Sequence, residues 1–169
     1  MTQPTDQNIR LQLMNFLKIK NVPTVQWSSD RPLNFKPRFK TFIYLVLGLI
    51  LFGFGESLLI HSMIGLSPWL VLAEGIAINL NWSIGFATFA CSVGVLLIWL
   101  PLKQKPGVGT ILNIIIIAGT IDLSMYLFNF STNSYLTNLI VGSLGVALVG
   151  LGSGIYLIAN LGPGPRDGL

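Results

Sequence analysis

One stretch decides the fold of this chain: Asn160-Leu-Gly-Pro-Gly-Pro-Arg-Asp-Gly-Leu169. An apolar segment of about membrane length, residues 138–161, leads directly into it. The two prolines and three glycines of the stretch end a helix, because proline lacks a backbone N–H and glycine adds conformational freedom. Arg166 and Asp167 follow at once, so the sequence predicts a helix that breaks beside a charged pair.

The same pattern occurs earlier in the chain, at a fixed shift of 97 positions and without a gap over 26 positions. The matched residues are Leu47 with Leu144, Gly48 with Gly145, Gly53 with Gly150, Gly55 with Gly152, Gly65 with Gly162, Pro68 with Pro165, and Leu72 with Leu169. Shared hydrophobicity does not explain matched glycines and prolines, so the pattern indicates an internal repeat. A complete second copy would run to about residue 240, so we expect the second copy to be incomplete here.

The composition places the chain in the membrane class. It is 52% apolar and only 9% charged, with a mean hydropathy of +0.71, whereas soluble domains carry about 25% charged residues. The net charge of +4 does not indicate nucleic-acid binding, because seven of the ten basic residues lie within the first 40. With one cysteine, Cys91, and one histidine, we expect no disulfide within the chain, no metal site and no cofactor.

Residues 1–40 are predicted to form a basic arm outside the bilayer. Within this arm, residues 7–20 fit either a weak amphipathic helix on the membrane surface or a loosely ordered tail. Lys36, Arg38 and Lys40 lie just before the first apolar segment, which places the N-terminus in the cytoplasm by the positive-inside rule. We therefore expect a multi-pass membrane protein with a cytoplasmic N-terminus.

Four apolar segments are long enough to cross the ~30 Å bilayer core. They are residues 41–63, 83–101, 110–130 and 138–161. A shorter helix is predicted over residues 68–80, with Pro68 in its first turn and Ser67 as its N-cap. The predicted fold is thus an all-α integral membrane protein with four transmembrane helices and a half-helix. Its first repeat unit is residues 41–143, and its second begins at residues 144–169.

Two topologies compete for residues 68–80: a half-helix that re-enters on the side it left, and a short, distorted full span. With the arm inside, re-entry delivers Lys103 and Lys105 to the cytoplasm, whereas a full span carries both lysines outside. Translocation of neighbouring lysines is disfavoured, so charge favours re-entry. Under re-entry, residues 138–161 run opposite to residues 41–63, and the repeat is of the inverted type.

Matching helix breaks in two inverted units are typical of transporters that bind solute near the bilayer midplane. The helix N-termini after Pro68 and Pro165 would offer free N–H groups to an anion or a polar solute. Carboxylates within spans are costly and usually have a function. We therefore predict a substrate site, and its candidate residues are Ser67, Glu56, Asp122, Arg166 and Asp167.

Three motifs resemble those of the YczE/YitT-type family of bacterial integral membrane proteins. The family's Gly-x-Gly-Pro-Arg-Asp-Gly-Leu signature matches Gly162, Gly164, Pro165, Arg166, Asp167, Gly168 and Leu169. The Lys-Pro-Gly-x-Gly-Thr loop matches Lys105, Pro106, Gly107, Gly109 and Thr110, with Asn113 just after. The Gly-x-Ser-Pro-Trp element matches Gly65, Ser67, Pro68 and Trp69. The resemblance covers all but the arm and implies a multi-spanning, transporter-like protein of the cell membrane.

One departure from the family pattern concerns the first half-site. Family members often have an aspartate after the tryptophan, where this chain has Leu70. Leu70 pairs with Asp167 in the internal repeat. The first half-site, at the helix break beside Pro68, is therefore expected to be less polar than the second half-site, at the break beside Pro165.

Two functions remain open from the sequence. The first is transport of a small solute through the site at the broken helices. The second is a non-transporting membrane protein with a partner-binding, assembly or regulatory role, for which we would expect a dry interior with Glu56 and Asp122 paired across helices. The acidic residues show no spacing typical of catalysis, so we expect no enzyme. The lipid bilayer is the expected partner, nucleic acid is not, and homo-oligomerisation is left open.

Overall fold

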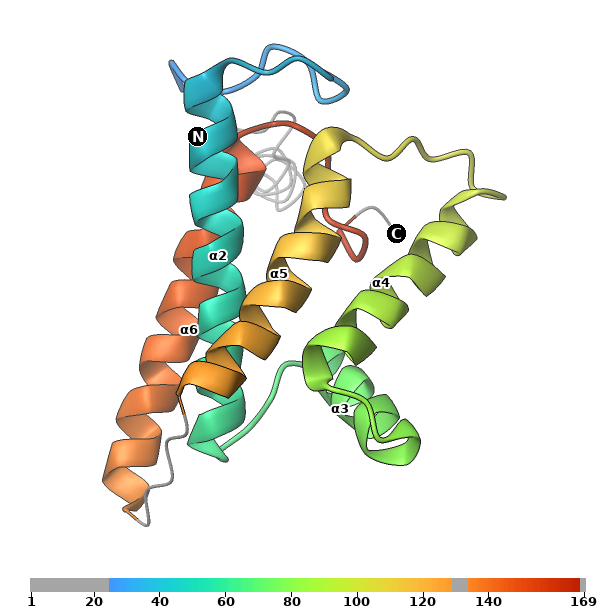
Figure 1. The fold of residues 1–169 in the computed structure, drawn as a ribbon. Coiled ribbons are helices and arrows are strands. Elements are labelled where there is room, and N and C mark those ends of the chain that lie inside the picture. The colour runs from blue at the N-terminus through green and yellow to red at the C-terminus, as the bar shows by residue number, and fades with distance from the viewer. Residues whose placement is uncertain (1–24, 129–133, 168–169) are drawn as a thin grey trace, which may run out of the picture.

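The computed structural model describes residues 25–128 and 134–167 (Figure 1). The elements in order are α2 (Phe39–Ser62), α3 (Pro68–Leu80), α4 (Ile84–Trp99), α5 (Val108–Leu127) and α6 (Tyr135–Ile158). The prediction of an all-α membrane protein is confirmed, and the described residues contain no strand. The surface helix expected over residues 7–20 and the motif residue Gly168 lie outside the described residues.

Among the helices of the described ranges, α2, α5 and α6 are long and apolar enough to cross a membrane. Helix α4 has 16 residues and is about 24 Å long, so it meets the length of a span only together with α3. The axes of α3 and α4 differ by 114°. The four predicted spans are therefore present as three full-length helices and one shorter helix that follows a sharply bent half-helix.

Helices α2 and α6 form an antiparallel pair held by close backbone contact (Figure 1). A Cβ added at Gly152 would lie 2.6 Å from the carbonyl oxygen of Gly48, and one at Gly55 would lie 2.8 Å from that of Gly145. Glycines at these positions let the helices approach closely, as small residues do in membranes. The shift of 97 positions converts Gly48 to Gly145 and Gly55 to Gly152. The repeat stays a prediction, and this reciprocal contact agrees with two copies that meet in an inverted arrangement.

Helix α5 packs on another face of α2. A Cβ at Gly53 would lie 2.8 Å from Cβ of Thr120, so glycine is needed at this crossing too. The main core lies among α2, α5 and α6 and includes the buried residues Leu49, Phe52, Ile117, Ile121 and Tyr156. Helix α4 contacts α5, and α3 contacts α4, so these two shorter helices attach to the body of the protein chiefly through α5.

The start of α3 follows the predicted rules. Met63 adopts a left-handed conformation (φ 53°) that ends α2. The hydroxyl of Ser67 then accepts a hydrogen bond from the backbone N–H of Leu70 at 3.3 Å, and Pro68 occupies the first turn. The predicted cap is confirmed, and the start of the half-helix coincides with the predicted residue.

Several chain segments meet at one end of the bundle, drawn at the top of Figure 1. There the backbone N–H of Ser29 donates to the carbonyl of Ala159 at 3.1 Å. The side chain of Asn160 donates in return to the carbonyl of Ser29 at 2.9 Å. The loop that carries Lys103 and Lys105 lies at this same end (Figure 1). The basic residues before and after α2–α4 therefore share one end, as the re-entry topology requires, while the side of the membrane stays a prediction.

Candidate functional site

The carboxylate of Glu56 is the central polar group within the helices. It lies on α2, and its residue is only 2% exposed. The hydroxyl of Ser67 is within hydrogen-bonding distance of both carboxylate oxygens, at 3.4 and 3.3 Å. Because the same hydroxyl caps α3, the buried acid is positioned by the break between α2 and α3.

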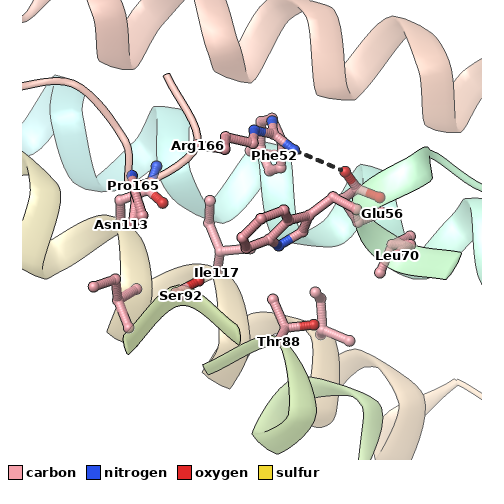
Figure 2. Close-up of a pocket in the computed structure, with 12 residues that line it drawn as sticks. Phe52, Glu56, Leu70, Thr88, Ser92, Asn113, Ile117, Pro165 and Arg166 are labelled. Carbon is pink, nitrogen blue, oxygen red and sulfur yellow. Dashed lines mark ion pairs between the residues drawn. The ribbon is translucent and has the colours of Figure 1, made fainter. Parts of the chain in front are cut away.

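Arg166 reaches Glu56 from the far end of the chain. Its guanidinium lies 3.8 Å from Glu56 and 3.8 Å from the neighbouring Asp167, so one cation lies between two carboxylates. It also lies 4.5 Å from the ring centre of Phe52, in the range of a cation–π interaction. The first and second predicted half-sites therefore meet at an ion pair, shown by the dashed line in Figure 2.

Asp167 is oriented by two donors as well as by Arg166. The hydroxyl of Tyr156, a residue that is 2% exposed on α6, donates to its carboxylate. The backbone N–H of Gly164 donates to the same carboxylate at 3.2 Å. A side chain at Gly164 would crowd Asp167 and Asn113. These contacts fold the Pro-Arg-Asp segment back toward α2 and present Arg166 to Glu56.

The two glycine motifs bind each other, in an arrangement that we call the clasp and define as residues 107–110 with residues 161–163. The backbone N–H of Gly109 donates to the carbonyl of Leu161 at 2.7 Å, and the hydroxyl of Thr110 donates to that of Pro163 at 2.6 Å. Gly162 has φ +110°, and a Cβ there would lie 2.9 Å from Cα of Gly107. The glycines are therefore required for backbone contact between the motifs, which the sequence did not predict.

A small cavity of about 20 Å³ lies beside the Glu56–Arg166 pair (Figure 2). This volume admits roughly one water molecule. Its lining residues come from every described helix but α6: Phe52, Glu56, Trp69, Leu70, Thr88, Ser92, Asn113, Ile114, Ile117, Ile121, Pro165 and Arg166. The predicted site residues Glu56 and Arg166 and the motif residues Trp69 and Pro165 are thus brought together at one small cavity.

Three further polar residues line this cavity: Thr88, Ser92 and Asn113. They are 4%, 5% and 9% exposed, respectively. Thr88 and Ser92 lie one turn apart on α4 and therefore share a face. That spacing within an apolar segment is the sequence signal that could have identified them. Leu70 also lines the cavity, which agrees with a first half-site less polar than the second.

Asp122 does not join this cluster. One of its carboxylate oxygens accepts from the hydroxyl of Ser83 at 2.6 Å, and the other accepts from the backbone N–H of Gly85 at 2.8 Å. Asp122 on α5 therefore holds the first turn of α4 together with the N-cap residue Ser83, and it is not among the residues that line the cavity. The alternative expectation, a pairing of Asp122 with Glu56, is also not observed, since Glu56 contacts Ser67 and Arg166.

Within residues 25–128 and 134–167, no group of three or more histidine, cysteine, aspartate or glutamate side chains is placed to hold a metal ion. The chemistry that this arrangement offers is therefore that of a buried carboxylate, a guanidinium and several hydroxyl and amide groups.

Residues 39–169 match a family model described as "Family of unknown function (DUF6198)". The chain belongs to this family. The match covers all five described helices. One relative is itself named as a membrane protein, in agreement with the apolar helices of this chain.

That relative is "Uncharacterized membrane protein YczE" of Bacillus subtilis (strain 168), which is 36% identical over 129 residues. An "Uncharacterized protein" of Haemophilus influenzae is 37% identical over 152 residues, or 90% of this chain. "Uncharacterized protein YyaS" of Bacillus subtilis is 30% identical over 131 residues. The YczE-type resemblance drawn from the three motifs is confirmed.

The DUF6198 chain spans 68%, 57% and 65% of the lengths of the Haemophilus influenzae protein, YczE and YyaS, respectively. Its alignment with YczE covers 72% of its own length. No solved structure matches the chain significantly.

Proposed function

We propose that this DUF6198 protein is transporter-like and binds a small polar solute at the cavity beside Glu56 and Arg166. Ser67 and Asp167 complete the proposed binding set, because each contacts one member of the ion pair. Asp122, which caps α4, supports the site from outside.

The observation that carries this proposal is the ion pair between the buried Glu56 and the partly exposed Arg166, which joins two chain breaks. Replacing a buried ion pair by apolar residues is often neutral or stabilising, so such a pair is weak support for a purely structural role. Ionisable groups within membrane segments commonly mark solute or ion pathways. Here Glu56 comes directly after Gly55 on α2, and Arg166 belongs to an irregular segment after α6. Irregular backbone within the bilayer is tolerated only against protein or a water-filled cavity.

The size of the cavity defines the state of the proposed carrier. About 20 Å³ is too small for any solute larger than a water molecule. The arrangement therefore fits a closed state, in which Arg166 occupies the place of a cationic group and Glu56 that of an anionic group. A solute with a carboxylate or an amine would exchange with one partner of the pair.

The proposed location is the bacterial inner membrane with the N-terminus in the cytoplasm. Lys36, Arg38 and Lys40 at the start of α2 support this orientation, and so do Lys103 and Lys105 at the same end of the bundle. Cytoplasmic ends of membrane helices carry an excess of lysine and arginine.

The proposal is tested by solute flux into proteoliposomes under an imposed membrane potential. Radiolabelled amino acids, amines and carboxylic acids are offered in turn, and uptake is compared with that of protein-free liposomes. We expect uptake from one class, lost in Arg166→Ala and in Glu56→Gln. Glu74→Gln is the matched control, because Glu74 lies on α3 and does not line the cavity. Uptake that is unchanged in Arg166→Ala would remove the site, and uptake from no class would remove the carrier proposal.

A second candidate function is the non-transporting, partner-binding one. The observation that favours it is the tight packing around Glu56, where the cavity has room for about one water molecule. Under this proposal the ion pair fixes the helix ends, no solute class is taken up, and partners co-purify with the protein from mild detergent.

A further inference from the structure

A second hollow, distinct from the small cavity, also reaches Glu56. It is an open groove of about 520 Å³ between the end of α2, the linker to α3 and one face of α6. Its lining is largely apolar: Glu56, Leu59, Ser62, Ile64, Gly65, Leu66, Ser67, Leu139, Gly142, Ser143, Val146 and Val149. We infer that this groove is the docking site of a second helix of the α5 type, supplied by polypeptide that follows Leu169.

The first argument compares the stripe of α2 that faces α5 with the matched stripe of α6. Leu49 is fully buried, whereas its match Val146 is 62% exposed. A Cβ at Gly53 would lie 2.8 Å from Thr120 of α5, whereas the described residues place nothing within 4 Å of a Cβ at its match Gly150. The positions that contact α5 in the first copy are therefore open in the second.

The second argument comes from the helix breaks. Gly162 packs against the start of α5, where its Cβ would lie 2.9 Å from Gly107. Its match Gly65 lines the groove, and the described residues place nothing within 4 Å of its Cβ. One break therefore contacts the first residues of α5, and the other lacks any such partner within the described part of the chain. A single helix that passes Gly65 with its start and Gly150 with its middle would supply both sets of contacts.

The glycines on the α2–α6 interface do not show this difference. Gly48 and Gly55 are buried, and so are their matches Gly145 and Gly152, because α2 and α6 contact each other through them. The loss of burial therefore appears at the compared positions in the stripe that faces α5, Leu49 and Gly53, and not at these interface glycines.

The repeat identifies the source of the helix. A shift of 97 positions moves α5 to about residues 205–224 in this numbering, beyond Leu169. The relatives are long enough to contain it, since the aligned segment covers 68% of the Haemophilus influenzae protein and 57% of YczE. A second copy of this chain fits less well, because its α5 already packs on its own α2 and clasp.

The test compares residues 1–169 with a version extended after Leu169 by the residues that follow the aligned segment of the Haemophilus influenzae relative. Gly150→Leu is introduced into both, and thermal unfolding is followed in detergent. We expect the unfolding temperature to change by under ~2 °C in the shorter chain and to fall by about 4–8 °C in the extended one. The larger loss is expected because a leucine side chain would overpack the helix crossing. Gly94→Leu is the control, because the described residues place nothing within 4 Å of Gly94 either, and Gly94 lies on α4 rather than on α6.

A labelling experiment covers the case in which the extended chain folds poorly. Gly150→Cys in a Cys91→Ser background is reacted with a membrane-permeable maleimide, in residues 1–169 and at the aligned position of the full-length Haemophilus influenzae relative. We expect fast labelling in the shorter chain and at least tenfold slower labelling in the relative. Equal fast labelling in both would overturn the inference. Protection of the shorter chain that disappears on dilution in detergent would also overturn it, in favour of a second copy.

Discussion

Glu56 and Arg166 lie 3.8 Å apart, although one belongs to the first long helix and the other follows the last. Glu56 is buried, and the side chain of Arg166 is 31% exposed. The pair therefore has an inner anion that depends on its partner and an outer cation that can still reach water. This asymmetry predicts different consequences for loss of the two charges.

Arg166→Ala should destabilise the protein by about 3 kcal/mol, because it leaves the carboxylate of Glu56 buried without its cation. The double variant Glu56→Gln/Arg166→Ala should recover part of that loss. Thermal unfolding of the single and double variants in detergent measures both effects. Additive losses in the double variant would show that the two side chains do not interact.

Gly152→Ala should weaken the α2–α6 pair by about 1–3 kcal/mol, because a methyl group there would lie 2.6 Å from the backbone of α2. Gly154→Ala is the matched control, since the described residues place nothing within 4 Å of a Cβ at Gly154. That variant should be neutral or stabilising, because alanine favours helix more than glycine does. Equal unfolding temperatures for the two variants would contradict the close backbone contact.

Thr110→Val should open the clasp at a cost of about 1–3 kcal/mol, since the carbonyl of Pro163 and the N–H of Gly107 would both lose a partner. Valine keeps the shape of threonine, so the change tests the hydroxyl itself. Thr120→Val, on the same helix, serves as control. Hydrogen exchange at the amide of Gly109 should become faster in Thr110→Val alone.

Asp122→Ala should loosen the start of α4 by about 1–2 kcal/mol, through loss of the cap on Gly85 and of the bond from Ser83. Hydrogen exchange should rise in the first turn of α4 and stay unchanged in α2 and α6. If exchange rose equally in all helices, the effect of Asp122 would be global rather than that of a cap.

Cysteines placed at Lys36 and at Lys103, each in a Cys91→Ser background, should react with an impermeant thiol reagent from the same side of the membrane. The segment before α2 and the loop between α4 and α5, which carry these positions, lie at one end of the bundle (Figure 1), and α3 does not add a crossing if it re-enters. Labelling from opposite sides would show that residues 68–80 cross the bilayer. The copies of the repeat would then point the same way.

The sequence predicted the helices closely because their ends are marked locally. Pro68 and Ser67 define the start of α3, and Gly107 precedes the start of α5. The predicted fourth span was the least accurate, since it was placed at residues 138–161 whereas the helix is α6 (Tyr135–Ile158). Apolar residues continue past Ile158 into Ala159 and Leu161, so hydropathy gives no signal of where this helix stops.

The site was only partly predictable. Glu56, Ser67 and Arg166 were identified as candidates, but their mutual contact depends on how the chain turns back after α6. Asp122 shows the opposite limit, because an acid within a span serves equally well as a ligand or as a helix cap, and only its neighbours distinguish the two. The contact between residues 107–110 and residues 161–163 required the three-dimensional structure, since each motif alone fits an ordinary turn.

The clasp has a mechanical consequence for any opening of the cavity. Because Gly109 and Thr110 bind the chain at Leu161 and Pro163, the wall that carries Pro165 and Arg166 is joined by hydrogen bonds to the start of α5. The opposite wall, with Trp69, Thr88 and Ser92, belongs to α3 and α4, which attach to the rest chiefly through one helix. Under the proposed carrier function, the α3–α4 hairpin would be the gate, and it would swing about the bonds that Asp122 makes to the start of α4.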